Sequence, residues 1–206
     1  MKIQSMVFVV LMLVGCGDNV NDRCDPHIGL VGDSLTWLPG WVELLSEEYE
    51  LKRHALPGVT TEFWLPGSDA HEAEEFSGCS YVILLGTNDA GFRLARPWTE
   101  FIDNMRLIAD DLVREHAADE IILMIPPPRM GDGIVVIFSN NLLEDYRSAL
   151  FELCEESFED AIVCGPDLFR NARPEYFLDD GVHFSSLGAE WVYQELSWFL
   201  ENDTRM

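Results

Sequence analysis

Short apolar runs alternate along the chain with longer segments in which apolar residues recur every three or four positions. Continuous apolar runs are typical of buried parallel strands, and the wider spacing is typical of amphipathic helices. The apolar runs predict five strands, at residues 28–31, 51–56, 81–85, 120–125 and 161–163. The wider spacing predicts helices at residues 41–49, 98–116, 141–158 and 187–200. This alternation favours an α/β fold, a three-layer α/β/α sandwich around a mostly parallel five-stranded sheet.

Two predicted connections are longer than chain closure requires, at residues 57–70 and 126–140. Both follow strands, and open α/β sheets bind ligands beyond the carboxyl ends of their strands. The second connection carries the apolar run Ile134–Phe138. We interpret that run as an extra strand, with the wall of an acyl pocket as the alternative.

The N-terminal residues are typical of an export signal. Lys2 precedes an apolar run, Met6–Val14, which suits a signal peptide and is too short to span a bilayer. The run ends in Leu13-Val14-Gly15-Cys16, which resembles a bacterial lipobox. We therefore expect a lipoprotein signal peptide (1–15), a lipidated Cys16, a short tether (16–25) and one domain (26–206). An ordinary signal peptide with a chance cysteine is the alternative.

Export of this kind predicts a bacterial lipoprotein held by its lipid anchor alone, on the periplasmic or extracellular side of a membrane. Acidic residues dominate the charge, with 37 Asp and Glu against 13 Lys and Arg, a net charge of −24. Nucleic-acid binding requires clustered cations, so we expect no nucleic-acid partner and no electrostatic docking on anionic lipid. The apolar content of 48% argues against intrinsic disorder.

The exported location is oxidising, which permits disulfides. Four cysteines follow Cys16 and allow three connectivities: Cys24, Cys79, Cys154 and Cys164. Cys24 and Cys79 each precede a predicted strand, so they lie at the same end of the sheet if those strands are neighbours. We favour the pairs Cys24–Cys79 and Cys154–Cys164, with four free thiols as the alternative. The cysteine spacing predicts no metal site.

Several residues that could take part in catalysis lie where predicted strands end. Ser34, Gly58 and Asn88 follow the first three strands, and Asp180 and His183 precede the last helix. In a parallel sheet these positions converge on one edge. A nucleophilic serine needs a base, a group that orients the base, and donors directed at the developing oxyanion. These five residues supply one candidate for each task.

Four sequence blocks, in order, closely resemble the SGNH (GDSL) hydrolase family. They are Gly32-Asp33-Ser34-Leu35, the lone Gly58, Gly86-Thr87-Asn88-Asp89 and Asp180-Gly181-Val182-His183. The resemblance spans essentially the whole domain and implies the SGNH hydrolase fold, with a flavodoxin-like sheet. The α/β-hydrolases also use serine, but they carry Gly-x-Ser-x-Gly, and Thr36 stands here in place of the second glycine.

The resemblance implies a role for each residue. Ser34 would be the nucleophile, His183 the general base and then acid, and Asp180 the group that orients His183. The backbone N–H groups of Ser34 and Gly58 and the side-chain amide of Asn88 would form the oxyanion hole. Asp180 and His183 are three positions apart, so one helical turn could bring them together. No metal or organic cofactor is implied. We assign Asp33 and Asp89 to hydrogen bonding within their loops.

These residues predict a serine ester hydrolase that forms an acyl-Ser34 intermediate. Its expected substrates are short-chain esters or esters of carbohydrates or lipids. Two alternatives stay open: a non-catalytic, surface-binding lipoprotein, and an acyltransferase that passes the acyl group to a sugar or lipid hydroxyl. The oligomeric state is left open.

The remaining aromatic and histidine residues have simpler interpretations. Four aromatics close to the motif blocks are candidates for a substrate wall, with core packing as the default: Trp37, Trp41, Phe63 and Trp64. Three recur at helical spacing near the C-terminus and are assigned to the core: Trp191, Trp198 and Phe199. Four histidines are placed at element ends or on the surface: His27, His54, His71 and His116. We interpret His71, within Asp69-Ala70-His71-Glu72, as part of a surface helix and not as a metal ligand.

Overall fold

The structure is a computed structural model that describes residues 25–91, 95–130, 140–156 and 161–202 of the 206-residue chain. Its strands form a single five-stranded sheet in the order β2-β1-β3-β4-β5. They are β1 (Asp25–Gly32), β2 (Leu51–Ala55), β3 (Gly78–Leu84), β4 (Glu120–Ile125) and β5 (Ile162–Asp167). Every neighbouring pair is parallel, which confirms the predicted sheet.

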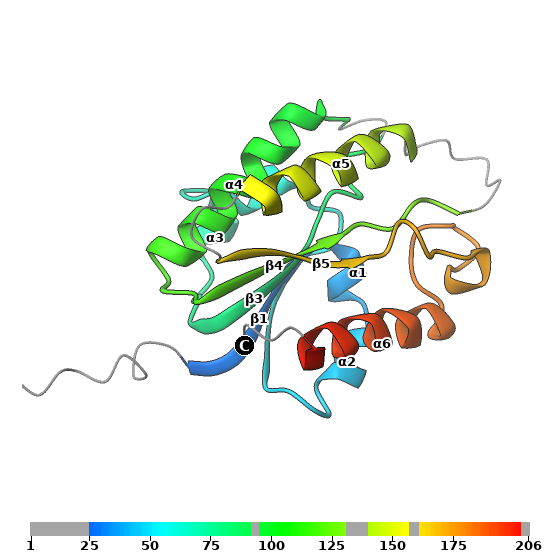
Figure 1. Ribbon diagram of the computed structural model, residues 1–206, viewed down its shortest axis with the longest axis horizontal. Coiled ribbons are helices and arrows are strands. Elements are labelled where there is room, and N and C mark those ends of the chain that lie inside the picture. The colour runs from blue at the N-terminus through cyan, green and yellow to red at the C-terminus, as the bar shows by residue number, and fades with distance from the viewer. Residues whose placement is uncertain (1–24, 92–94, 131–139, 157–160, 203–206) are drawn as a thin grey trace, which may run out of the picture.

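Helices cover both faces of the sheet and complete the predicted three-layer sandwich (Figure 1). One face carries the short α3 (Asp69–Glu72) and the long α4 (Trp98–Arg114) and α5 (Asn140–Glu156). The other face carries α1 (Ser34–Trp37), α2 (Trp41–Leu45) and α6 (Ser186–Asn202). Among the described residues, no helix combines the length and apolarity needed to cross a membrane.

The sheet separates two hydrophobic cores, because successive strand residues point to opposite faces. Ile83 of β3 belongs to the core beneath α4 and α5, whereas its neighbour Val82 belongs to the core beneath α6. Phe101 of α4 stacks on Tyr146 of α5 with ring centroids 4.0 Å apart, and both rings are fully buried. This stacking joins the two long helices above the sheet.

Several element boundaries differ from the prediction. The first predicted helix, 41–49, is the shorter α2, and the predicted connection 57–70 contains the 3-10 helix η2 (Thr61–Trp64) as well as α3. A second 3-10 helix, η3 (Pro174–Tyr176), precedes α6. Helices of three or four residues contain too little sequence to show a period, so the pattern could not reveal them. The run Ile134–Phe138 lies outside the described residues.

A disulfide joins Cys154 near the end of α5 to Cys164 of β5, with Cα atoms 5.6 Å apart, and this prediction is confirmed. Cys79 is also disulfide-bonded. Cys24 lies outside the described residues, so the predicted Cys24–Cys79 pair stays a prediction. The same holds for the signal peptide, Cys16 and the tether up to residue 24.

The aromatic residues near the motif blocks partly follow the default interpretation. Trp41 and Trp64 are buried and belong to the core, as that default held, and Trp41 also contributes to the wall of a small pocket at Ser34. Trp198 was expected in the core but is 65% exposed. Trp191 and Trp198 are two turns apart on α6, but Trp191 belongs to the core beneath this helix. Tyr176 of η3 stacks on Trp191, with ring centroids 4.7 Å apart, whereas Trp198 lies beyond this cover.

Three of the four histidines, which were placed at element ends or on the surface, are buried, so the surface part of that expectation is wrong for them, including the position on a surface helix expected for His71. His27, His54 and His71 have at most 8% of their area exposed. His54 packs against Phe76, with ring centroids 4.6 Å apart, and its Nδ1 lies 2.6 Å from the Glu74 carboxylate. A polar ring at the end of a strand is buried here because a carboxylate partner satisfies it.

Candidate active site

The residues predicted for catalysis follow three adjacent strands. Ser34 follows β1, Gly58 follows β2 and Asn88 follows β3. The chain leaves β1 for β2 on one side, and returns to add β3 on the other side of β1. Loops diverge from the sheet at such a reversal and leave a crevice at the carboxyl ends of the strands, where ligands bind in open α/β folds.

Ser34 is presented at the start of a short helix. Asp33 caps α1, and its carboxylate Oδ1 accepts a hydrogen bond of 2.9 Å from the Leu35 N–H. Ser34 is the first residue of this helix, so its N–H belongs to the terminal donors that have no partner within a helix. The side chain and the backbone donor of Ser34 are therefore both offered at the crevice.

The structure brings three predicted side chains into one chain of hydrogen bonds. His183 Nε2 lies 3.0 Å from Ser34 Oγ, and His183 Nδ1 lies 2.7 Å from Asp180 Oδ2. The second carboxylate oxygen of Asp180 accepts from the backbone N–H groups of Val182 and His183. Asp180 and His183 lie in a turn before α6, so the expected helical turn is replaced by one that the Asp180 carboxylate itself holds.

Asp180 remains ionised in this arrangement. Partial burial raises its pKa, but the hydrogen bonds from the His183 ring and from two backbone N–H groups outweigh burial and hold the pKa below its ordinary value. An ionised carboxylate at Nδ1 fixes the ring orientation and leaves Nε2 directed at the serine hydroxyl. Such a ring can accept a proton from Ser34.

The predicted oxyanion donors have different surroundings. Gly58 is exposed and has a φ of +77°, and no heavy atom lies within 4 Å of the place where a Cβ would stand. Glycine is favoured here by the positive φ of the backbone, and not by a lack of space for a side chain. The amide nitrogen of Asn88 donates to Asp33 Oδ2 at 3.1 Å and to the Val59 carbonyl at 2.9 Å. Both Asn88 donors are thus engaged by neighbouring loops, which the sequence did not indicate.

Asp33 and Asp89 bind their loops together, as predicted. Asp89 is fully buried and accepts hydrogen bonds from the N–H and the hydroxyl of Thr61, which ties η2 to the loop after β3. Burial raises the pKa of Asp33 to about 7 and also raises the pKa of Asp89. The crevice therefore rests on two buried carboxyl groups whose ionised forms are disfavoured by their surroundings.

A small pocket at Ser34 and a larger cavity share part of their lining. A small pocket of about 10 Å³ is lined by Ser34 itself, with Leu35, Leu38, Pro39 and Phe184 among its walls. A larger open cavity of about 520 Å³ shares Pro39 and Phe184 with that pocket. Its lining also includes polar side chains that can form hydrogen bonds, namely Ser185, Ser186, Glu190 and Tyr193. Ser34 thus stands at a tight pocket whose wall is shared with a larger, partly polar cavity.

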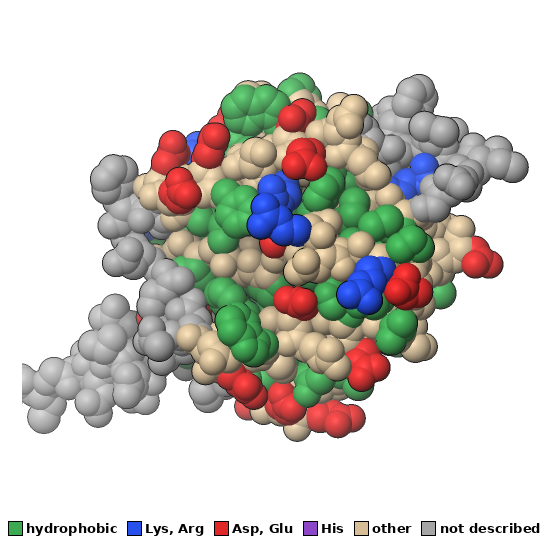
Figure 2. Space-filling model, turned by 45° about the vertical axis from the view of Figure 1, so that its right-hand side comes forward, with side chains coloured by type: hydrophobic (Ala, Val, Ile, Leu, Met, Phe, Trp, Pro, Cys, Tyr) green, Lys and Arg blue, Asp and Glu red, His purple; other side chains and the backbone are tan. Residues whose placement is uncertain are grey.

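The surface around the molecule is acidic. In the face shown in Figure 2, Asp and Glu side chains are spread over the surface, and Lys and Arg side chains are fewer. Hydrophobic side chains lie between the charges, and the exposed residues include Trp37 and Phe63, with 45% and 47% of their area accessible. Trp37 and Phe63 are thus accessible to a ligand from solvent, whereas the buried Trp41 contributes to the wall of the small pocket at Ser34.

A parallel α/β/α sandwich with a hydrogen-bonded Ser-His-Asp set beyond its strand ends is the architecture of a serine hydrolase of the SGNH class. Residues 30–191 match the model of the GDSL-like Lipase/Acylhydrolase family, and the chain belongs to this family. The family resemblance inferred from the four motif blocks is confirmed.

Individual relatives agree with this assignment. A GDSL esterase/lipase from Arabidopsis thaliana is 30% identical over an alignment of 133 residues, and the match covers 56% of this chain and 41% of that protein. The chain thus matches less than half the length of that relative. A solved structure from Streptococcus pneumonia is 26% identical, with a TM-score of 0.69 over 86% of this chain and 83% of the other. A carbohydrate esterase family 3 structure from Talaromyces cellulolyticus shares the fold, with 16% identity and a TM-score of 0.70 over 86% and 97% of the two chains.

Proposed function

We propose that this protein is a serine ester hydrolase that works through an acyl-Ser34 intermediate. The hydrogen bond of 3.0 Å between Ser34 Oγ and His183 Nε2, with Asp180 on the opposite ring nitrogen, carries the proposal. His183 takes the hydroxyl proton as Ser34 Oγ attacks the ester carbonyl, and then passes that proton to the departing alcohol. Water next attacks the acyl-serine, giving its proton to His183, and the carboxylic acid leaves as Ser34 is restored.

The negative charge that develops on the carbonyl oxygen needs donors. The backbone N–H groups of Ser34 and Gly58 and the amide of Asn88 are the donors in this proposal. Asn88 must turn one N–H from Asp33 or Val59 toward the substrate, because both of its donors are engaged without substrate. Asp33 and Val59 thereby hold the amide at the crevice before the reaction begins.

The small pocket at Ser34 and the larger cavity support a short acyl group and a larger alcohol. The pocket lined by Ser34 has room for little more than one small group, so acetyl fits this size better than a long chain. The adjoining cavity has the volume and the hydroxyl, carboxylate and phenol groups to bind a hydroxylated alcohol such as a sugar. The carbohydrate esterase from Talaromyces cellulolyticus lends this choice support. The acidic surface disfavours anionic substrates.

The test compares initial rates of the full chain in mild detergent on p-nitrophenyl esters from acetate to palmitate. We expect the highest kcat/KM on the shortest acyl chains, and a loss of about 10⁴-fold or more in Ser34→Ala. Ser46→Ala is the matched control, since the Ser46 hydroxyl only donates to the carbonyl of Glu43.

Three outcomes would contradict parts of the proposal. A turnover rate in Ser34→Ala equal to that of the wild type would refute Ser34 as the nucleophile. An optimum on long chains would refute the short acyl group and leave the hydrolase intact. Absence of turnover on every ester by a folded protein would return the function to a non-catalytic, surface-binding lipoprotein.

We also propose that Cys16 carries a lipid anchor that holds the domain on the outer side of a bacterial membrane. The apolar run Met6–Val14 and the small Gly15 before Cys16 support this. Expression in bacteria with radiolabelled palmitate should label the wild type in the membrane fraction, and Cys16→Ser should carry no label. A labelled Cys16→Ser protein would contradict the assignment of the anchor to this residue.

A further inference from the structure

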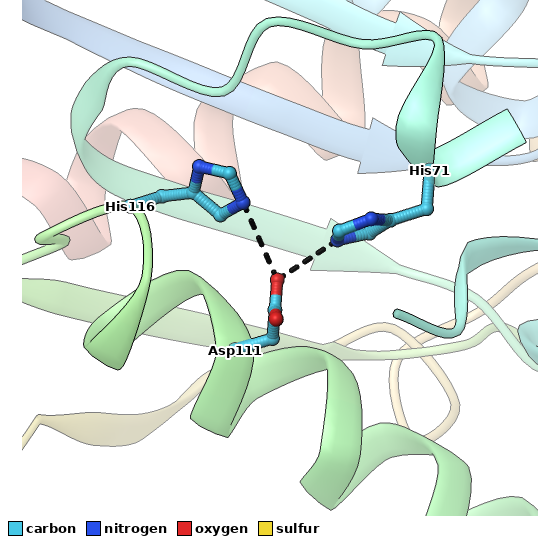
Figure 3. A group of neighbouring side chains, drawn as sticks. All are labelled: His71, Asp111 and His116. Carbon is cyan, nitrogen blue, oxygen red and sulfur yellow. Dashed lines mark hydrogen bonds and ion pairs between the residues drawn. The ribbon is translucent and has the colours of Figure 1, made fainter. Parts of the chain in front are cut away.

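A second group of polar side chains, outside the catalytic site, unites three separate elements. His71 comes from α3, Asp111 from the last turn of α4, and His116 from the connection between α4 and β4 (Figure 3). His71 Nε2 lies 2.8 Å from Asp111 Oδ2, and His116 Nε2 lies 3.4 Å from the same oxygen. Both imidazoles therefore point their Nε2 atoms at one carboxylate, as Figure 3 shows.

The surroundings of this cluster are largely apolar. His71 is only 8% exposed, and the Asp111 and His116 side chains are 13% and 25% exposed. The Phe76 ring packs against both imidazoles, with centroids 5.1 Å from each. The Ser68 hydroxyl caps α3 by accepting from the His71 N–H. Packing and capping thus fix the ring directions, as a preformed ligand set requires.

The electrostatics of the cluster favour a cation. The end of a helix carries partial negative charge, so a carboxylate in the last turn of α4 is unfavourable without a positive partner. A carboxylate oxygen of Glu72 lies 3.7 Å from His71 Nδ1 and adds further negative potential. The whole chain has a net charge of −24. A divalent ion would relieve the repulsion that these groups create.

The second nitrogen of His71 supplies an independent observation. Nδ1 is buried, and it has no hydrogen-bond partner within the part of the chain that the structure describes. If Nε2 gives its lone pair to a metal, the ring proton moves to Nδ1, where it faces the Glu72 carboxylate. A ligating histidine usually donates its other N–H to a carboxylate in this way. Metal binding would therefore give a role to a buried atom that otherwise has none.

We propose that His71, Asp111 and His116 bind a divalent transition-metal ion such as Zn²⁺, with water as the fourth ligand. The three ligand atoms already lie within 4.8 Å of one another. Tetrahedral zinc with nitrogen and oxygen ligands at about 2.0–2.2 Å holds them about 3.3 Å apart, so small side-chain rotations suffice. Two imidazoles and one carboxylate suit zinc, whereas calcium and magnesium prefer oxygen ligands.

The location makes this site structural and independent of catalysis. α4 ends at Arg114 and β4 begins at Glu120, so the cluster lies at the edge where strands begin. Ser34 lies at the opposite edge, where strands end. In Figure 1 α3 is on the left of the sheet, and the loops that follow the strands extend to the right. The ion would join the four-residue α3 to the end of α4 and stabilise that corner of the fold.

The experiment titrates Zn²⁺ into the metal-free full chain by calorimetry and measures the melting temperature with and without the ion. Co²⁺ serves as a spectroscopic substitute that reports tetrahedral coordination. We expect one equivalent to bind, with a rise in melting temperature. Asp111→Asn and His116→Gln should each weaken binding at least 10-fold and abolish that rise, while esterase activity persists. His116 lies on a partly exposed connection, so its replacement leaves the core intact.

Two matched controls locate the ion. Asp110→Asn removes one charge from the neighbouring position of α4 and should bind Zn²⁺ as the wild type does. His183→Ala removes the catalytic imidazole and should also retain binding. Absence of binding to the folded wild type would overturn the proposal. Binding that survives Asp111→Asn and His116→Gln, or that disappears in His183→Ala, would overturn it as well.

Discussion

The buried carboxyl group of Asp33 should make the stability of this protein fall as the pH rises. Burial raises its pKa to about 7, and the charge of Asp89 adds to this, while hydrogen bonding from Leu35 and the charge of His183 act in the opposite direction. The ordinary value is 3.8. Between these values the folded chain retains a proton that the unfolded chain has lost. The folded state then binds more protons, so the free energy of unfolding decreases with increasing pH.

The magnitude follows from the two pKa values. From about pH 5 to the folded-state pKa of about 7, a span of about two pH units, the unfolded chain has lost the proton and the folded chain keeps it, and at about pH 8 the carboxyl is almost fully ionised in both states. One unit corresponds to about 1.36 kcal/mol, so Asp33 withdraws roughly 2.6 kcal/mol of stability over this interval. Other groups titrate too: Asp89 acts in the same direction, and His54, whose pKa burial lowers, acts in the opposite direction.

A comparison with Asp33→Asn isolates the contribution, because asparagine does not titrate and the other groups are common to both proteins. Urea unfolding of both proteins at about pH 5 and pH 8 gives the stability difference at each pH. We expect the advantage of the wild type over the variant to shrink by roughly 2.6 kcal/mol from the lower to the higher pH. Asp180→Asn is the control: the pKa of Asp180 is lowered, so its contribution changes below this interval. A wild-type advantage that stays constant or grows with pH would refute the reasoning.

Three further substitutions test other parts of the structure. Replacing Cys154 and Cys164 together by alanine frees a loop with a sequence separation of 10, and should cost about 2.7 kcal/mol in urea unfolding; under reducing conditions this difference from the wild type should disappear, because the wild type then loses the same bond. Gly188→Ala places a methyl group 1.9 Å from the Tyr176 carbonyl oxygen and should cost about 1–3 kcal/mol, visible as a lower melting temperature; an unchanged value would contradict the packing of η3 on α6. Asn88→Ala should lower kcat about 10²–10³-fold with little change in KM, and an unchanged kcat would remove Asn88 from the oxyanion hole.

The architecture was predictable because its strands are continuous apolar runs. The run 81–85 led to β3, and the regular spacing in 98–116 led to α4, since both signals are long enough to exceed chance. The sequence could not predict the burial of a side chain that is covered by a segment distant along the chain. Trp191 and Trp198 are the same residue type at helical spacing, yet Trp191 is covered by Tyr176 and Phe184 and Trp198 is exposed.

The residues of the candidate site were predictable from sequence motifs, whereas the contacts between distant loops were not. Motif blocks located Ser34, Asp180 and His183, because their types and order are themselves the signal. The hydrogen bond from Asn88 to Asp33 joins two loops 55 positions apart, and no local pattern encodes such a distance. The cluster of His71 and Asp111 is similar: its members are 40 positions apart and meet only after α3 packs beside α4.

The wide separation of Ser34 and His183, which are 149 positions apart, bears on how the protein is made. A ribosome that has added residues through Asp167 has supplied all five strands, yet the base has not been synthesised. Under the proposed function, every chain that stops before His183 would carry Ser34 without its base. Under that same function, esterase activity would therefore report only chains that extend through His183, and shorter fragments would leave the surrounding esters intact.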